Sequence, residues 1–145
     1  VIENSVPLGE YERTGISLDA QVSSQLLLNI FEHNTPLHDG AIIVRGNRIV
    51  SATCYLPLSD NMNLSKDLGT RHRAAVGISE VSDALTVVVS EETGMMSITS
   101  GGELKRNVTV EELRERLLEL KEIPTENKRF RPWKGWKKDE DKLGE

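Results

Sequence analysis

The sequence predicts a single α/β domain in which helices flank a central mixed β-sheet. Segments with the periodicity of strands alternate along the 145 residues with segments of helical periodicity. In addition, two predicted strands are separated only by Gly46-Asn47, a pair typical of a tight hairpin turn. The hairpin makes part of the sheet antiparallel, whereas helical connections favour parallel pairing, so we expect both kinds.

The first half of the chain is predicted to contain one helix and one β-hairpin. Residues 18–31 are predicted to form the helix, because apolar side chains recur there at every fourth position. These are Leu18, Val22, Leu26 and Ile30. Polar and helix-breaking residues follow, up to Gly40. Strands are then predicted at 41–45 and 48–56, on either side of the hairpin turn.

The second half continues the alternation of helices and strands. A polar loop at 57–69 precedes a predicted helix at 71–80. The continuous apolar run at 85–90 is typical of a buried strand. A turn at 91–94 connects it to a predicted strand at 95–99.

A further helix is predicted after Thr109, where the chain carries a capping box. In this motif the side chains of Thr109 and Glu112 bind backbone N–H groups of the first turn. Pro124 is predicted to end the helix. We therefore assign residues 1–123 to the folded domain and residues 124–145 to a charged tail that contains both tryptophans. The tail is either a membrane-surface or partner-binding segment or a flexible extension.

The charge of the chain is uneven. Residues 1–123 carry 11 basic and 18 acidic side chains, and residues 124–145 carry 7 basic and 5 acidic ones. An acidic domain argues against nucleic acid as a partner, because broad nucleic-acid binding requires basic surface. A nucleotide substrate is still allowed, because a few local arginines can hold its phosphates. The single cysteine, Cys54, excludes a disulfide within the chain and is predicted to be a small buried side chain.

Two polar clusters precede a predicted strand and a predicted helix. The first is His38-Asp39-Gly40-Ala41, whose carboxylate can bind a cation or accept a proton and whose glycine would let a ligand approach the backbone closely. An ordinary Asp-Gly turn is the alternative. The second is Gly69-Thr70-Arg71-His72-Arg73, where N–H groups of a helix start and two arginines suit phosphates. A solvated basic patch, or ion pairs with the acidic domain, is the alternative.

A third cluster, Ser90-Glu91-Glu92-Thr93-Gly94, follows the predicted buried strand. Ligands often bind beyond the carboxyl ends of strands, and adjacent acids can hold a divalent metal; a plain acidic turn is the alternative. Tyr55 lies at another strand end beside Leu56, where its ring either stacks on a base or packs into the core. Together these groups fit nucleotidyl transfer without fixing the reaction.

Two short motifs in these clusters resemble the signature of the diadenylate cyclase (DAC) domain. They are Asp39-Gly40-Ala41 and Arg71-His72-Arg73, and the resemblance extends over roughly residues 13–104. The surrounding phrases include VSSQLLLNIF, NTPLHDGAI, CYLPLS and LGTRHRAAVGISEVSDALTVVVSEETG. The resemblance is to the membrane-anchored CdaA type rather than to the DNA-scanning type.

The resemblance implies a nucleotidyltransferase that condenses two ATP molecules into cyclic di-AMP and releases pyrophosphate. Asp39, beside Gly40 and Ala41, would assist activation of the ribose 3′-hydroxyl. Arg71, His72 and Arg73 would be catalytic through their hold on the triphosphate. The implied ATP-binding residues are Tyr55, Leu56, Gly69, Thr70, Arg71, His72, Arg73, Ser90 and Glu91, of which Tyr55 and Leu56 would border the adenine.

The resemblance also implies a divalent metal, Mn²⁺, Mg²⁺ or Co²⁺. Its ligands would be His38, Asp39 and Glu92, with the choice between Glu91 and Glu92 left open. Each 3′-hydroxyl would attack the α-phosphate of the other ATP, so two copies of the chain would meet face to face as a homodimer.

The implied full-length protein is anchored at the cell membrane with a cytoplasmic catalytic domain. Its implied regulators are a membrane regulatory protein and a phosphoglucosamine mutase. The family's first strand begins upstream of Val1, and its incompleteness here is expected to loosen the edge of the sheet.

Three other functions compete with this interpretation. A non-catalytic nucleotide-binding module would bind ATP without turnover, although a pure sensor does not need Asp39. A metal-dependent phosphohydrolase could use His38, Asp39 and His72, but such enzymes usually need more metal ligands than this chain supplies. A structural interaction domain would show no response to ATP.

Overall fold

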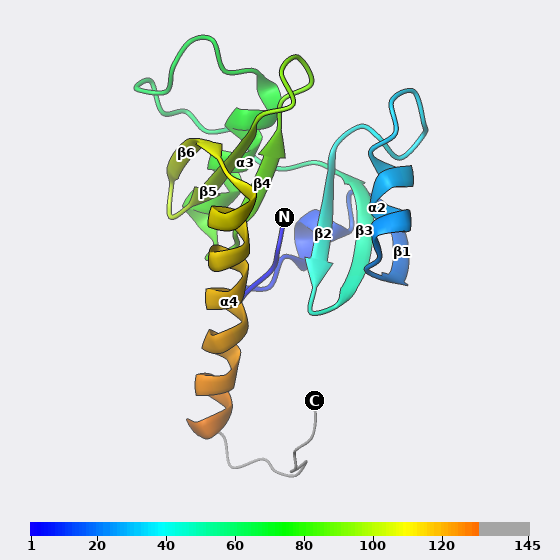
Figure 1. Ribbon diagram of the computed structural model, residues 1–145, viewed down its shortest axis with the longest axis vertical. Coiled ribbons are helices and arrows are strands. Elements are labelled where there is room, and N and C mark those ends of the chain that lie inside the picture. Colours follow the sequence, from blue (N-terminus) through cyan, green and yellow to red (C-terminus); the bar gives the residue numbers. More distant parts are fainter. Residues whose placement is uncertain (131–145) are drawn as a thin grey trace. The chain divides into compact units, whose positions relative to one another are not determined.

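The computed structural model describes residues 1–130, with side chains up to residue 120, and it confirms the predicted α/β class. The chain divides into two compact units, the first from Val1 to Val108 and the second beginning at Thr109. The first unit holds every strand of the described residues (Figure 1).

The first unit contains nine helices and strands. They are α1 (Gly9–Glu12), β1 (Ile16–Gln21), α2 (Ser24–Ile30), β2 (Ala41–Arg45), β3 (Arg48–Cys54), α3 (Thr70–Val81), β4 (Thr86–Val89), β5 (Met96–Ser100) and β6 (Glu103–Val108). The strands form two three-stranded antiparallel sheets, with the orders β1-β3-β2 and β4-β5-β6. The predicted hairpin is thus confirmed as β2 and β3.

Residues 1–3 join the two sheets. Ile2 pairs in parallel with Val44 of β2 and antiparallel with Leu85, which precedes β4. The Ile2 N–H donates to the Leu85 carbonyl at 2.7 Å, and the Glu3 N–H donates to the Val44 carbonyl at 2.9 Å. The predicted central sheet is thus observed as two antiparallel sheets joined by this segment, and the Ile2–Val44 bridge is the parallel pairing in the described residues. The segment is hydrogen-bonded on both sides, and the looser edge expected from a shortened first strand stays a prediction.

The strands β2 and β3 carry buried residues on both of their faces, whereas β1 at the edge of the sheet has no buried residue. Ile42 of β2 and Ile49 of β3 pack in one cluster with Ile30 of α2 (Figure 1). Ile43 and Cys54 belong to a second cluster, which includes part of α3. Neighbouring residues of a strand point to opposite faces, so these strands need apolar side chains at consecutive positions. Cys54 is buried, as predicted.

The segment predicted as one helix at 18–31 holds a strand followed by a helix. Leu18, Ala20 and Val22 are half-buried while the residues between them are exposed, which is the alternation of a strand. The prediction was wrong because a four-residue spacing is also a multiple of two and fits a strand equally well. The helix α2 begins only at Ser24.

Ser23 caps α2 and marks its true start. Its side-chain oxygen accepts a hydrogen bond from the Leu26 N–H at 3.1 Å. We expect Ser23→Ala to lower the free energy of unfolding by about 1 kcal/mol, because that N–H loses its partner. Ser24→Ala is the matched control: its hydroxyl donates only to the Gln25 side chain, and we expect a change within about 0.5 kcal/mol. Equal losses of unfolding free energy for the two variants in urea denaturation would contradict the assignment of Ser23 as the cap.

The second unit contains α4 (Val110–Phe130). The predicted capping box is confirmed, because the Glu112 N–H donates to Thr109 Oγ1 at 3.1 Å and the Thr109 N–H donates to Glu112 Oε1 at 2.9 Å. The prediction that Pro124 ends the helix is wrong. A proline removes one backbone donor, and the glutamates and lysines around it favour the helix.

The predicted tail at 124–145 therefore begins within α4. From residue 131 onward, including Trp133 and Trp136, it lies outside the described residues. Its two interpretations stay predictions. Among residues 1–130, no helix is both long and apolar enough to cross a lipid bilayer.

Candidate active site

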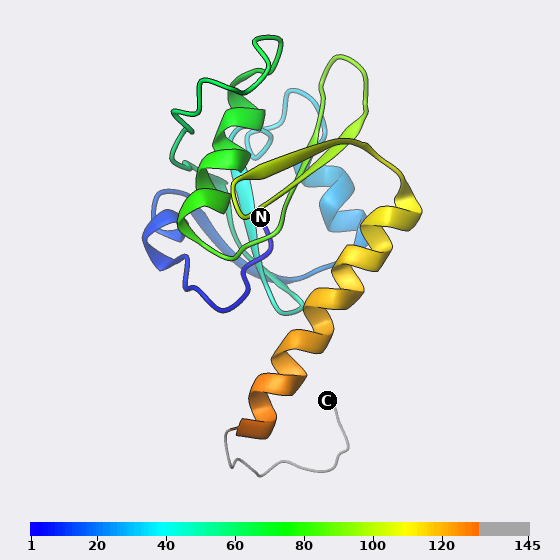
Figure 2. The ribbon, with the colours of Figure 1, turned by 90° about the vertical axis from the view of Figure 1, so that its left-hand side faces the viewer.

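The three predicted clusters lie at one end of the first unit (Figures 1 and 2). The loop between α2 and β2 carries His38 and Asp39, α3 begins at Thr70, and the β4–β5 turn carries Glu91. These segments meet where β3 and β4 finish and where β2 and α3 begin. Residues far apart in the sequence are thereby brought together.

Glu91 connects the three clusters. One of its carboxylate oxygens, Oε2, lies 3.1 Å from His38 Nε2 and 2.6 Å from Arg71 Nη1. The hydrogen bond from His38, and next that from Arg71, lower the pKa of the Glu91 carboxyl below its ordinary value of 4.5. Glu91 is therefore an ionised acceptor at neutral pH that holds groups from two of the predicted clusters.

A second histidine, His33, joins this group. Its ring meets the His38 ring edge-on, with 5.4 Å between the ring centroids. His33, His38 and Glu91 each offer one ligand atom, and these atoms lie within 4.8 Å of one another. Because the Glu91 carboxylate accepts, His38 Nε2 is the donor; His38 Nδ1 is buried without a partner among the described residues. Two imidazoles and a carboxylate fit a divalent cation.

His33 is absent from the sequence-based prediction. It lies outside both signature motifs, five residues before His38. The chain turns beside it, because Asn34 adopts a left-handed conformation with φ of 70°. The signal in the sequence is that two of the three histidines occur in one short loop.

Gly40 allows two backbone segments to approach each other. Its φ is +79°, and a Cβ atom there would lie 2.8 Å from the carbonyl carbon of Thr53 in β3. The β3 backbone makes a close approach at this glycine, and the predicted approach of a ligand stays a prediction. The contact with β3 fixes the position of the preceding Asp39, whose exposed carboxylate makes no hydrogen bond or ion pair with residues 1–120. Ala41 then begins β2, opposite Cys54.

Tyr55 follows β3 and is 74% exposed, so the alternative that its ring packs into the core is wrong. Its backbone N–H donates to Thr14 Oγ1 at 2.8 Å. The neighbouring Leu56 is half-buried against the core. A fixed backbone therefore presents an aromatic ring to solvent at the end of the unit that carries Glu91.

The start of α3 presents the second cluster. Gly69 is the N-cap residue, and no side chain of residues 1–120 caps the first turn, so its N–H groups remain available to an anion. The Arg73 N–H donates to the Gly69 carbonyl at 3.2 Å, and the Arg73 carbonyl accepts from the Ser59 N–H at 3.0 Å. Arg71 forms an ion pair with Glu91, as one alternative predicts for this cluster.

His72 lies near an ion pair between Arg106 and Asp67, whose closest atoms are 3.3 Å apart. Partial burial lowers the pKa of His72 below its ordinary value of 6.5, and the charge of Arg106 lowers it further, against the opposing effect of Asp67. The neutral imidazole is therefore favoured in the folded protein.

His72 is expected to make the fold less stable in mild acid. Its folded pKa lies below 6.5, so between those two values the unfolded chain binds more protons. The stability that the neutral ring confers is complete above about pH 6.5 and is lost as the pH falls through the folded pKa. His72→Gln should flatten this part of the profile in urea denaturation between about pH 5 and 7.5. A slope unchanged by the substitution would contradict this prediction.

The β4–β5 turn carries Ser90 and Glu92. The Ser90 hydroxyl accepts hydrogen bonds from the N–H groups of Glu92 at 3.2 Å and Thr93 at 3.3 Å, so it shapes the turn. The Glu92 carboxylate is exposed and makes no hydrogen bond or ion pair with residues 1–120. Of the two adjacent acids, Glu91 is the one that contacts His38.

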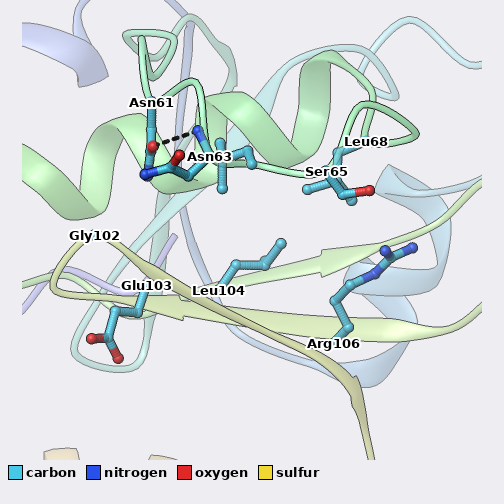
Figure 3. Close-up of a pocket in the computed structure, with 9 residues that line it drawn as sticks. Asn61, Asn63, Ser65, Leu68, Gly102, Glu103, Leu104 and Arg106 are labelled. Carbon is cyan, nitrogen blue, oxygen red and sulfur yellow. Dashed lines mark hydrogen bonds between the residues drawn. The ribbon is translucent and has the colours of Figure 1, made fainter.

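A depression of about 420 Å³ lies between the 57–69 loop and the β5–β6 hairpin (Figure 3). Figure 3 shows the Asn61 side chain accepting a hydrogen bond from the Asn63 N–H, with Arg106 across the depression below Ser65 and Leu68. This hydrogen bond is 2.9 Å long. The residues that line the depression are Asn61, Asn63, Leu64, Ser65, Leu68, Gly102, Glu103, Leu104 and Arg106. None of the predicted site residues is among them.

Known proteins resemble this chain over most of its length. Residues 1–104 match the family described as DisA bacterial checkpoint controller nucleotide-binding, or DAC. A diadenylate cyclase of Listeria monocytogenes is 60% identical over 134 residues, which are 90% of this chain and 48% of that protein. Cyclic di-AMP synthase CdaA of Bacillus subtilis is 60% identical over 116 residues, 80% of this chain and 42% of that protein. This chain thus spans about half the length of these relatives.

The fold is also that of a solved relative. The crystal structure of an N166C/T172C double mutant of DacA from Staphylococcus aureus superposes with a TM-score of 0.80 and 54% identity. The match covers 82% of this chain and 79% of that one. The sequence resemblance is therefore confirmed, and the chain belongs to the DAC family of nucleotide-binding domains.

Proposed function

We propose that this chain is the catalytic domain of a diadenylate cyclase, which joins two ATP molecules into cyclic di-AMP and releases two pyrophosphates. The observation that carries the proposal is the convergence of the three clusters at one end of the first unit, where the Glu91 carboxylate contacts both Arg71 and His38, the neighbour of Asp39. The relatives named diadenylate cyclase and cyclic di-AMP synthase support it.

The triphosphate would bind at the start of α3. The uncapped N–H groups after Gly69 and the positive end of the helix dipole favour an anion there. Arg71 and Arg73 would add charged donors, and Thr70 and His72 would add further donors. Ser90 and Glu91 would border the same phosphates from the β4–β5 turn. These groups would hold the α-phosphate in line for attack and neutralise charge on the departing pyrophosphate.

Asp39 would accept the proton of the attacking group. The 3′-oxygen of one ATP forms a bond to the α-phosphorus of the other, and the bond from that phosphorus to the pyrophosphate oxygen breaks. The hydroxyl proton passes to the Asp39 carboxylate, which makes no hydrogen bond or ion pair with residues 1–120. The Gly40 contact with β3 holds the backbone beside it, and Ala41 anchors that backbone in β2.

The adenine would lie against Tyr55 and Leu56. The Tyr55 ring is exposed and its backbone is held by Thr14, so stacking would need little rearrangement. Leu56 is half-buried against the core and would form an apolar border.

A divalent cation would be held near Asp39. The family resemblance suggests His38, Asp39 and Glu92 as ligands, whereas the geometry favours His33 and Glu91 beside His38. A set with two imidazoles suits Mn²⁺ or Co²⁺ better than Mg²⁺, which prefers oxygen ligands. When bound, the cation would lower the cost of forming the attacking alkoxide.

The reaction would require two copies of the chain. The product is two-fold symmetric, so two sites that each hold one ATP would face each other in a homodimer. The exposed positions of Asp39 and Tyr55 are compatible with a site completed by a second copy. We further propose, from the resemblance to the CdaA type, that the whole protein is membrane-anchored and is regulated by a membrane protein and a phosphoglucosamine mutase.

Product analysis tests this function. The purified chain is incubated with ATP and Mn²⁺, Co²⁺ or Mg²⁺, and the products are separated by chromatography and identified by mass spectrometry. Cyclic di-AMP with pyrophosphate supports the cyclase, and inorganic phosphate in place of pyrophosphate would indicate a phosphohydrolase. Intact ATP with every metal, despite ATP binding, would indicate a nucleotide-binding module without turnover.

A further inference from the structure

We propose that Glu91 couples the cation site to the phosphate site by exchanging one partner for another. In the free protein its carboxylate holds Arg71; a divalent cation bound with His33 and His38 takes over that carboxylate and releases the Arg71 guanidinium for a phosphate. The inference rests on the proposed function, because it assumes that this cluster binds the cation and that Arg71 binds the phosphate.

The starting point is a shared oxygen atom. Glu91 Oε2 is the atom nearest both to Arg71 Nη1, at 2.6 Å, and to His38 Nε2, at 3.1 Å. The distance to Arg71 is that of a strong charge-assisted hydrogen bond. One carboxylate oxygen of Glu91 also lies within 4.8 Å of a ring nitrogen of His33 and of His38. Glu91 therefore already uses, for Arg71, the carboxylate that the cation would need.

The charges make the two partners of Glu91 compete. A divalent cation and a guanidinium on the same carboxylate oxygen would repel each other at short range. The Arg71 side chain is long and 36% exposed, so it has a path toward solvent, whereas the two histidines and Glu91 are already close enough to act as ligands. The cation is therefore expected to displace Arg71 rather than the reverse.

The ion pair also lowers the affinity for phosphate in the absence of a cation. The Glu91 carboxylate occupies one nitrogen of the Arg71 guanidinium, Nη1, that would otherwise donate to a phosphate oxygen. A phosphate can bind Arg71 only in those molecules in which the guanidinium is free of Glu91. Its apparent affinity is therefore the intrinsic affinity multiplied by the fraction of such molecules. Glu91 is therefore a positioning residue for Arg71 as well as a candidate ligand.

Anion binding without a cation tests the coupling. Inorganic tripolyphosphate is titrated calorimetrically in excess EDTA into the wild-type chain and into Glu91→Gln. We expect Glu91→Gln to bind it about threefold to fivefold more tightly, the ratio that corresponds to losing a partly exposed ion pair. Glu91→Asp, which keeps the charge but shortens the side chain, should give a smaller gain in the same direction.

Glu32→Gln is the matched control. Its carboxylate is exposed in the neighbouring loop and makes no hydrogen bond or ion pair with residues 1–120, so tripolyphosphate affinity should not change. In the companion titration, Mn²⁺ alone should bind more weakly to both Glu91→Gln and His33→Ala, but His33→Ala should leave tripolyphosphate binding in EDTA unchanged.

Several outcomes would overturn the coupling. They are an unchanged or weaker affinity of Glu91→Gln for tripolyphosphate, an equal gain in Glu32→Gln, or no tripolyphosphate binding by any form. None of these measurements requires turnover. A chain that forms no cyclic di-AMP but shows the expected pattern would refute the proposed function alone, whereas a chain that forms cyclic di-AMP without the pattern would refute the coupling alone.

Discussion

The Asp39→Asn variant is expected to bind ATP with nearly wild-type affinity and to form cyclic di-AMP at least about a hundredfold more slowly. Removing a general base typically costs a factor of about 10² to 10⁴ in rate. Asparagine has almost the same shape, but its amide cannot accept the hydroxyl proton. Because the Asp39 carboxylate makes no hydrogen bond or ion pair with the described side chains, the substitution should leave the fold intact.

Asp60→Asn is the matched control for this experiment. Asp60 is another exposed aspartate, on the 57–69 loop, and its substitution removes the same charge from the surface. Calorimetry measures ATP binding, and chromatography measures the rate of product formation. If Asp39→Asn formed product at the wild-type rate, Asp39 would not be the proton acceptor. A parallel loss of ATP binding would instead assign Asp39 to substrate binding.

The local signals of the sequence were sufficient where one short motif determines the structure. Gly46-Asn47 predicts the β2–β3 turn, and the Thr109–Glu112 pair predicts the capping box. These signals were insufficient where the apolar spacing fits a helix and a strand equally well, as at Leu18 and Val22. The strand β6 was not predicted. It is the last strand in its sheet order and is mostly exposed, so it has few apolar side chains and its sequence carries little strand signal.

The candidate site could be predicted as three clusters but not as one constellation. The resemblance points to Asp39 and Arg71, whereas the contact between their two clusters runs from His38 through Glu91 to Arg71. The choice between Glu91 and Glu92 depends on the conformation of the β4–β5 turn, which Ser90 fixes through hydrogen bonds to two backbone N–H groups. To predict that His33 belongs to the site, one must know the path of a loop that contains a left-handed residue. The spacing of residues along the chain reveals neither this loop path nor the conformation of the β4–β5 turn.

Gly77→Ala is expected to destabilise the first unit by about 3 kcal/mol or more. Gly77 is buried in α3, where a Cβ atom would lie 1.9 Å from the Pro57 carbonyl oxygen and 2.7 Å from its carbonyl carbon. Both are backbone atoms, so the 57–69 loop would have to move away from the helix. That loop is also tied to α3 through Ser59, whose N–H donates to the Arg73 carbonyl at 3.0 Å and whose hydroxyl donates to Glu80 at 2.7 Å.

The same displacement would reach the site, because the loop connects Tyr55 at the end of β3 to Arg71 at the start of α3. We therefore expect Gly77→Ala to weaken ATP binding together with stability. Gly9→Ala is the control: it also adds a methyl group to a helix, but the nearest atom, at 3.5 Å, is the end of the Arg13 side chain. Urea denaturation should show a large loss for Gly77→Ala and a change within about 1 kcal/mol for Gly9→Ala. Equal changes in the free energy of unfolding would mean that α3 accommodates the added methyl group. Close packing at Gly77 would then not set the distance between the base-binding and phosphate-binding residues.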